Sequence, residues 1–429
     1  MSKTLTVELS DHLYDRLNLY LQTRGYSREE WVREAIEGWV AVLNRQRRSH
    51  PRIDHSSDIA PQCPCGGLIM PKIQAVDAEG NPVLWHDDQP VEYYLVNFDK
   101  EGVEEDPDSG SRELVQALAS ERPTDVFIFC HGWKTDIERA QVQYGKWLKA
   151  IAGRMEADWS QLDAARDGQF RPLFVGLVWP SLVGGDYDWE GELSDTSRSP
   201  AVGSDGSADS DEQQAIEKII WQANRYSEQL NNVSRLKSEF PKSLPQEMRK
   251  LDRELNLLYG LKYEGVGAKP GDDREGFDYK TSYINRRKQL IKDGRTDEDS
   301  VRDALLEPLR VLSFWKMKKR ACRVGESGGF QLLQQLQQAA PPARFHLMGH
   351  SFGCIVVSAM LTGHNGGGHL SRPVDSLVLL QGALSCYSYC GEIAFTRPKM
   401  PGYFYPIVKD SREGGQRLRF VGRPIPTYL

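Results

Sequence analysis

The sequence predicts an α/β protein built on a mostly parallel sheet. Short apolar runs of strand length lie at 93–98, 125–130, 173–179, 345–349 and 376–382. Because these runs are apolar at nearly every position, we expect strands buried on both faces, as in a parallel sheet covered by helices. Helical patterns at 138–153 and 326–338 separate several of the runs, so strands and helices alternate along the chain. We therefore expect a doubly wound sheet.

Composition places the chain among globular proteins. It has 429 residues, of which 39% are hydrophobic, enough to bury one large core or two smaller ones. No run approaches about 18 consecutive apolar residues, and the start lacks an apolar run followed by a cleavage site. Seven cysteines, an odd number spread thinly, fit a reducing compartment better than a disulfide framework. We expect a cytoplasmic protein with no membrane span; the net charge of -6 identifies no partner.

Residues 1–48 carry the pattern of a small strand-helix-turn-helix unit. Residues 3–9 alternate polar and apolar as a half-buried strand does, and Ser10 can cap the helix that follows. Leucines recur at every fourth position before Gly25, which ends that helix, and Ser27 begins a second one. The pattern resembles the ribbon-helix-helix family, whose units become stable as dimers. The resemblance implies a homodimer formed through residues 1–48.

Members of that family commonly bind DNA through polar strand side chains, which here would be Thr4, Thr6 and Glu8. Residues 1–43 hold five Lys/Arg against seven Asp/Glu, so the basic footprint of a DNA-binding protein is missing. Only the RQRR stretch at 45–48 adds positive charge. The charge balance favours dimerisation and argues against nucleic acid as a partner.

Residues 49–90 are broken by Pro, Gly and His without a sustained period, and are predicted to be a linker to a main domain at 91–429. Cys63 and Cys65 could bind zinc with His50 or His55. Structural zinc sites, however, usually have two to four residues between the cysteines of a pair and contain two such pairs. Only one residue separates Cys63 from Cys65. An ordinary linker is therefore the preferred interpretation.

A long insertion at 181–310 interrupts the alternation of strands and helices. Its first part, 182–212, has nine acidic side chains and one arginine, and is predicted to be a mobile solvated loop. A metal-binding acidic loop is the alternative, but regular ligand spacing is missing. The rest of the insertion is charged and helical in pattern, which suits either a lid over a substrate pocket or a decorative helical hairpin.

The stretch HLMGHSFG at 346–353 predicts a nucleophilic serine at Ser351. A strand precedes it and an apolar helix of suitable length follows, which is the setting of a nucleophile elbow. Gly349 and Gly353 are expected to be required because a Cβ at either position would collide with the neighbouring element. The serine would then lie at the mouth of the sheet, over a helix N-terminus that favours developing negative charge.

The residues HGW at 131–133 follow the strand 125–130 directly, where a second donor to an oxyanion is expected. Together FIFCHGW, LVWPS and FHLMGHSFG, in this order, resemble the α/β-hydrolase superfamily in its esterase and lipase-like branch. The resemblance covers roughly residues 90–429, apart from the insertion. It implies the following roles: Ser351 as nucleophile, the backbone N–H groups of Trp133 and Phe352 as oxyanion-hole donors, and His131 and Gly132 as residues that shape the oxyanion loop. It also implies a small ester or similar acyl substrate, and no cofactor or metal.

The general base and the acid are not identified. Superfamily members place both after later strands, in the order Ser, Asp or Glu, His. His350 is expected to point away from Ser351 across the turn, as a structural residue. His364 and His369 fall beyond the following helix, about 12–15 Å from the serine. Glu392 and Asp410 are not assigned either.

The stretch 420–429 has the pattern of a further strand, and the sequence stops there. Cys386 and Cys390 could edge the pocket, but buried free thiols are commoner than reactive ones and neither receives a role. Two hypotheses follow. The first is a serine hydrolase that is incomplete at the C-terminus or takes its base from elsewhere. The second is a catalytically silent hydrolase-fold protein with a dimerising or DNA-binding N-terminus.

Overall fold

The computed structural model describes residues 72–181, 264–274, 279–295 and 298–409, apart from 86, 106–109, 395 and 397. The ribbon-helix-helix-like segment, the CPC stretch, the acidic loop and the strand-like stretch at 420–429 therefore lie outside the described residues.

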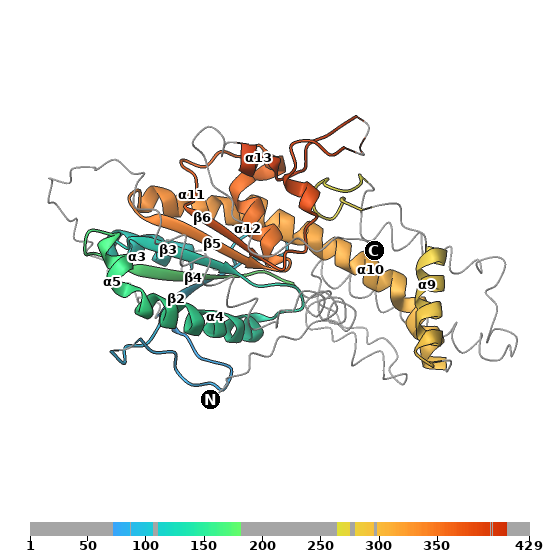
Figure 1. The fold of residues 1–429 in the computed structure, drawn as a ribbon, viewed down its shortest axis with the longest axis horizontal. Helices are drawn as coiled ribbons and strands as arrows, with labels where there is room; N and C mark the ends of the chain where they lie inside the picture. The colour runs from blue at the N-terminus through green and yellow to red at the C-terminus, as the bar shows by residue number, and fades with distance from the viewer. Residues whose placement is uncertain are drawn as a thin grey trace, which may run out of the picture.

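The core of the fold is a six-stranded sheet with the strand order β1-β2-β4-β3-β5-β6 (Figure 1). The strands are β1 (Ile73–Gln74), β2 (Glu92–Asn97), β3 (Asp125–Cys130), β4 (Pro172–Val178), β5 (Arg344–His350) and β6 (Ser376–Leu380). The last five are parallel, and β1 pairs antiparallel with β2. The five apolar runs in the sequence correspond to these five parallel strands. The prediction of an α/β protein with a mostly parallel sheet is therefore confirmed.

The sheet begins earlier in the chain than residue 91. Ala75, Val83 and Val91 are buried, and antiparallel bridges join Val76 to Pro82 and Leu84 to Pro90. This part of the predicted linker thus packs on the main domain. Its strand pieces are only one or two residues long and are separated by turns, which is why no period is visible in the sequence.

Helices cover both faces of the sheet (Figure 1). On one face lie α4 (Ile137–Ala157) and α5 (Trp159–Ala164), which pack on alternate strand residues such as Phe127 and Phe129. On the other face lie α3 (Ser111–Glu121), α11 (Phe330–Ala339) and α12 (Gly353–Thr362), which pack on the intervening residues such as Val126 and Ile128. Both faces of each central strand are therefore buried, as the apolar runs predicted.

The described end of the insertion is a helical hairpin. Helix α9 (Tyr279–Lys292) packs against α10 (Glu298–Val324), and the hairpin projects away from the sheet (Figure 1). Helix α10 runs past the predicted boundary at 310 and its second half packs on α12. Short helices at His364–Gly366, Cys386–Tyr389 and α13 (Tyr405–Lys409) complete the described chain. None of the helices in these ranges has the length and hydropathy needed to cross a membrane.

A π-helical turn, Gly325–Gly329, joins α10 to α11. Its glycines allow close packing: a Cβ on Gly325 would lie 2.3 Å from the Val356 carbonyl oxygen, and one on Gly328 would lie 2.2 Å from that of Gly102. π-turns are rare and occur mostly as single turns inside α-helices. Here the turn lets the chain pass directly over α12.

Candidate active site

Ser351 occupies the sharp turn between β5 and α12 and has a left-handed backbone, with φ of 54°. Such a conformation is uncommon for a residue with a Cβ and is found disproportionately at functional sites. The end of β6 holds it in place: the Ser351 N–H donates to Leu380 O at 3.0 Å, and the Ser351 carbonyl accepts from the Ala383 N–H at 3.1 Å. The turn is thus fixed by backbone hydrogen bonds on both sides of the serine.

The two glycines that flank the turn have no room for a side chain. A Cβ on Gly349 would lie 2.4 Å from the Gly353 oxygen, and a Cβ on Gly353 would lie 2.2 Å from the Cys130 oxygen at the end of β3. The neighbouring atoms are backbone atoms, which cannot move aside cheaply. Glycine at both positions allows β5, α12 and β3 to meet closely under Ser351.

The loop after β3 lies directly beside the serine. A Cβ on Gly132 would lie only 3.0 Å from the Ser351 Cβ, so the absence of a side chain at Gly132 makes room for the serine. The backbone N–H groups of Trp133 and Phe352 donate no hydrogen bond to any described residue. Phe352 stands at the N-terminus of α12, where N–H groups lack helical partners and the helix dipole favours negative charge. The two predicted donor N–H groups therefore belong to segments next to the serine and have no partner among the described residues.

His131 is fully buried and holds the loop in shape. Its Nε2 accepts the Trp179 backbone N–H at 3.3 Å, so its Nδ1 carries the hydrogen and donates to Gly132 O at 2.8 Å. Its ring stacks on that of Trp179, with centroids 5.8 Å apart. Burial lowers the pKa of His131 to about 4. The imidazole is therefore neutral at physiological pH, with both nitrogens engaged, and it serves the loop rather than proton transfer.

The same loop is fastened to the end of β4. The Thr135 N–H donates to Ser181 Oγ at 2.9 Å, and that hydroxyl donates back to Thr135 O at 2.8 Å. Lys134, which lies between Trp133 and Thr135 in the sequence, is another non-glycine residue with a positive φ, 56°. Ser181 is the last residue of the LVWPS stretch, so this stretch supports the loop 131–135 from the neighbouring strand.

Three aromatic rings pack beside the serine. Trp133 and Phe352 have ring centroids 5.5 Å apart, and Phe314 of α10 lies 5.1 Å from Phe352 and 5.9 Å from Trp133. Among the residues the structure describes, nothing accepts a hydrogen bond from the buried Trp133 Nε1–H. Nothing in the sequence singles out Phe314, because α10 and the turn at Ser351 come together only in the folded chain.

The unpaired indole donor leads to a prediction about stability. Replacing Trp133 by phenylalanine keeps an aromatic ring and removes a buried donor that has no acceptor, so we expect a loss of less than about 1 kcal/mol in the free energy of unfolding. Trp179→Phe is the matched control, because the Trp179 Nε1–H donates to His131 O at 3.2 Å. That change should cost about 1–2 kcal/mol more. Urea unfolding of both variants measures the difference, and a larger loss for Trp133→Phe would contradict the assignment.

No described histidine forms a hydrogen bond with the Ser351 hydroxyl. His350 points across the turn: its Nε2 lies 3.1 Å from Gln381 Oε1 and its Nδ1 lies 3.4 Å from Gln143 Nε2. Burial lowers the pKa of His350, so its ring is neutral at physiological pH. Within the described ranges, the Ser351 hydroxyl forms no hydrogen bond.

The other sequence candidates lie elsewhere. His364 and His369 follow α12, whose ten residues span about 15 Å and carry them to the far end from Ser351. Glu392 forms an exposed ion pair with Lys399. Asp410 lies outside the described residues, as do the remaining histidines, His12, His50, His55 and His86.

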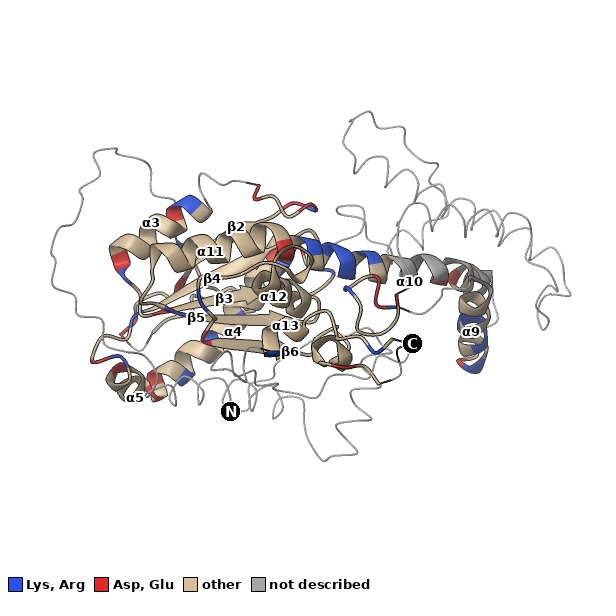
Figure 2. Cartoon of the chain, turned by 90° about the horizontal axis from the view of Figure 1, so that it is seen from above, with Lys and Arg blue, Asp and Glu red and all other residues tan. Residues whose placement is uncertain are grey.

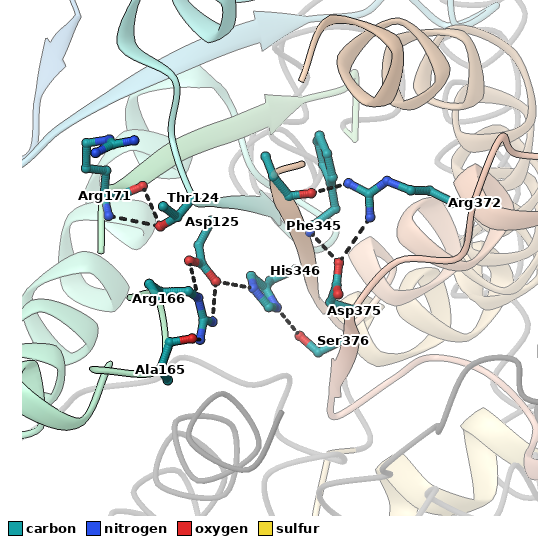
Figure 3. A network of polar contacts seen from close by, with 11 residues as sticks. Thr124, Asp125, Ala165, Arg166, Arg171, Phe345, His346, Arg372, Asp375 and Ser376 are labelled. Carbon is teal, nitrogen blue, oxygen red and sulfur yellow. Dashed lines mark hydrogen bonds and ion pairs between the residues drawn. The ribbon is translucent and has the colours of Figure 1, made fainter. Parts of the chain in front are cut away.

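A buried Asp-His-Ser chain lies at the opposite edge of the sheet (Figure 3). Asp125 Oδ1 accepts from His346 Nε2 at 3.0 Å, and His346 Nδ1 lies 2.8 Å from Ser376 Oγ. Arg166 donates to both carboxylate oxygens of Asp125, at 2.6 and 2.7 Å. Sequence reasoning missed this group, since its only signal is a histidine in an apolar strand.

The Asp125-His346-Ser376 network differs from the surroundings of Ser351 in position and in burial. Asp125 and His346 are 0% exposed, and Ser376 is 7% exposed. Asp125 and Ser376 are the first residues of their strands, whereas ligands of parallel sheets bind at the carboxyl ends. The Asp125-His346-Ser376 network therefore joins β3, β5 and β6 at their amino-terminal ends, away from Ser351.

No cluster of three or more His, Cys, Asp or Glu side chains suited to a metal ion occurs among the described residues. Cys386 is exposed and Cys390 half-buried, and both are free thiols.

No family model matches the chain, and neither a curated protein nor a solved structure matches it. Function is therefore inferred from the residues of the chain itself.

Proposed function

We propose that the protein is a serine hydrolase of the α/β-hydrolase type, which acts on an ester or similar acyl substrate through Ser351. The observation that carries the proposal is the left-handed backbone of Ser351, φ 54°, in a turn that ends β5 and begins α12. A strained strand-to-helix turn of this kind presents a serine hydroxyl at the top of a parallel sheet in such enzymes.

The position of the loop 131–135 gives independent support. It follows β3, the strand adjacent to β5, and it brings the Trp133 N–H to the same edge as the Phe352 N–H. Two backbone donors from these places form the oxyanion hole in hydrolases that carry the elbow. The hydrolase-type fold is part of the same proposal.

In the proposed reaction, Ser351 Oγ attacks the acyl carbon while its proton passes to a base. The carbonyl oxygen becomes an oxyanion that accepts hydrogen bonds from the Trp133 and Phe352 N–H groups. Collapse of this intermediate breaks the ester C–O bond, the alcohol takes up the proton, and an acyl-enzyme remains. Water then hydrolyses the acyl-enzyme and restores the serine.

A fluorophosphonate probe and p-nitrophenyl butyrate test the proposal. We expect the probe to label the wild-type chain and Ser351→Ala to abolish labelling, because only an activated serine reacts. We also expect Ser351→Ala to lower ester hydrolysis by about 100-fold or more. Ser120→Ala, at an exposed position on α3, is the control and should behave as the wild type does. Equal rates for wild type and Ser351→Ala would rule the proposal out.

The same assay locates the base. If turnover depends on Ser351, single replacements of His12, His50, His55 and His86 by alanine show whether one of them accepts its proton. The base variant should lose kcat without a matching change in KM, because it acts on the chemical step rather than on ground-state binding.

A second candidate is a catalytically silent protein that keeps the hydrolase fold and uses residues 1–48 as a dimerising unit. The observation in its favour is that every described histidine is either engaged in other hydrogen bonds or placed beyond α12. Without a base the serine stays protonated and weakly nucleophilic. A folded wild-type chain that resists the phosphonate would support this candidate over the first.

A further inference from the structure

Helix α10 connects the insertion to the carboxyl edge of the sheet. Figure 2 shows Lys and Arg residues, in blue, along the half of α10 that is nearest the sheet. Several of them form hydrogen bonds or ion pairs with neighbouring segments. Arg320 donates to the Pro180 oxygen after β4 at 3.0 Å, and Arg323 pairs with Glu101 after β2 at 2.7 Å. Lys318 forms a buried ion pair with Asp273 at 2.5 Å. This half of α10 is thus fixed to the strand ends.

Phe314 lies on the same helix, just before these contacts. Its ring touches the rings of both Trp133 and Phe352, at centroid distances of 5.9 and 5.1 Å, and those two rings touch each other at 5.5 Å. Edge and tilted contacts at these distances are favourable arrangements of aromatic pairs and stabilise them beyond burial alone. The three rings therefore form one packed unit from three separate parts of the chain.

The two partners of Phe314 are the residues that carry the proposed oxyanion donors. The Phe352 N–H is set by the start of α12, whereas the Trp133 N–H belongs to a loop with a strained neighbour, Lys134. An oxyanion hole works only when its donors lie about 2.7–3.1 Å from the developing charge. A ring that bridges both residues fixes the distance between the two donors.

We propose that Phe314 is a positioning residue of the oxyanion hole, through which the helical insertion sets the geometry of the active site. The inference rests on the proposed serine hydrolase function and deepens it. Phe314 touches the side chains of both donor residues, so its proposed role is exerted through them. Removing its ring should let the Trp133 loop shift, which misplaces one donor and weakens binding of the transition state more than binding of the substrate.

The test compares Phe314→Ala and Phe314→Tyr with Phe170→Ala. The Phe170 ring packs on that of Trp159, the first residue of α5, with centroids 5.1 Å apart. Phe170→Ala therefore removes a packed aromatic ring at a place far from Ser351 and is the matched control. We expect Phe314→Ala to lower kcat for p-nitrophenyl butyrate by about 10- to 100-fold with KM within about twofold. Affinity for a trifluoromethyl ketone, which forms a tetrahedral oxyanion adduct, should fall in parallel. Phe314→Tyr keeps the aromatic ring and should retain both the wild-type kcat and the wild-type affinity for the ketone.

Phe170→Ala should lose stability but keep kcat per folded molecule. The inference is overturned if Phe314→Ala retains wild-type kcat, or if its loss of kcat matches that of Phe170→Ala at equal folded fraction. Failure of the proposed function gives a different result: the wild type then hydrolyses the ester no faster than Ser351→Ala. That outcome removes both proposals, whereas an active wild type with an unaffected Phe314→Ala removes only the second.

Discussion

Replacement of Asp125 by asparagine is expected to destabilise the protein by about 3–5 kcal/mol. Asp125 is fully buried and binds Arg166, whose side chain is only 2% exposed, as well as His346. Asparagine has nearly the same shape, but it leaves the guanidinium without its counter-charge in the core. A charge that is buried and unpaired costs far more than the intact pair contributes.

Urea unfolding followed by circular dichroism measures this loss. Glu101→Gln is the matched control, because it removes a carboxylate from an ion pair with Arg323 in which both side chains are about half exposed. Pairs of that kind contribute about 0–1 kcal/mol. Similar losses for the two variants would mean that burial of the Asp125 network has little energetic consequence.

The effect of Asp125→Asn should depend on pH. Burial alone would raise the pKa of the Asp125 carboxyl, but hydrogen bonds from His346 and Arg166 outweigh it and hold that pKa below the ordinary value of 3.8. A folded-state pKa below the unfolded one gives stability that is present above pH 3.8 and is lost as pH falls further. The stability gap between wild type and Asp125→Asn should thus be constant near neutrality and shrink in acid.

Gly353→Ala is expected to cost about 3 kcal/mol or more and to abolish labelling of Ser351 by the phosphonate. The new Cβ would lie 2.2 Å from the Cys130 oxygen and 2.5 Å from the His131 oxygen. Relief of that contact requires α12 to move away from the end of β3. The oxyanion loop follows His131, so the same movement would separate it from the serine.

A glycine in a helix with open surroundings provides the control. A Cβ on Gly153 of α4 would meet nothing within 4 Å. Gly153→Ala should therefore stabilise the protein by about 0.5–1 kcal/mol, through the lower entropy of the unfolded chain. Thermal unfolding and phosphonate labelling of both variants test the contrast, and a fully labelled Gly353→Ala protein would disprove the requirement for close packing under the elbow.

Much of the sheet could be predicted because each buried strand is encoded locally. The runs at 125–130 and 345–349 are apolar at nearly every position, and the turn at Ser351 is flanked by glycines within four residues. Gly132 and Ser351 each follow a predicted parallel strand, so the sequence places both at the carboxyl edge of the sheet. Their contact depends in addition on the pairing of β3 with β5. The two residues of β1 escaped notice because they are too few to show a period.

Contacts between distant parts of the chain could not be predicted. Asp125 and His346 are brought together by the register of β3 on β5, and Ser376 by the register of β5 on β6. Phe314 reaches the oxyanion loop only because α10 crosses the strand ends. A proton acceptor for Ser351 was not found in the sequence, and no described histidine forms a hydrogen bond with its hydroxyl.

The π-turn at Gly325–Gly329 sets the rotational phase of two helices independently. An α-helix turns by about 100° per residue, and a π-turn absorbs one residue more than an α-turn does. The phase of α10 is fixed by its contacts at the strand ends, while that of α11 is fixed by Leu332, Leu333 and Leu336 against the sheet. A continuous α-helix would turn those leucines about 100° away from the core. The extra residue of the π-turn thus rotates α11 relative to α10, so that both the strand-end contacts of α10 and the core contacts of α11 can form in one long helical segment.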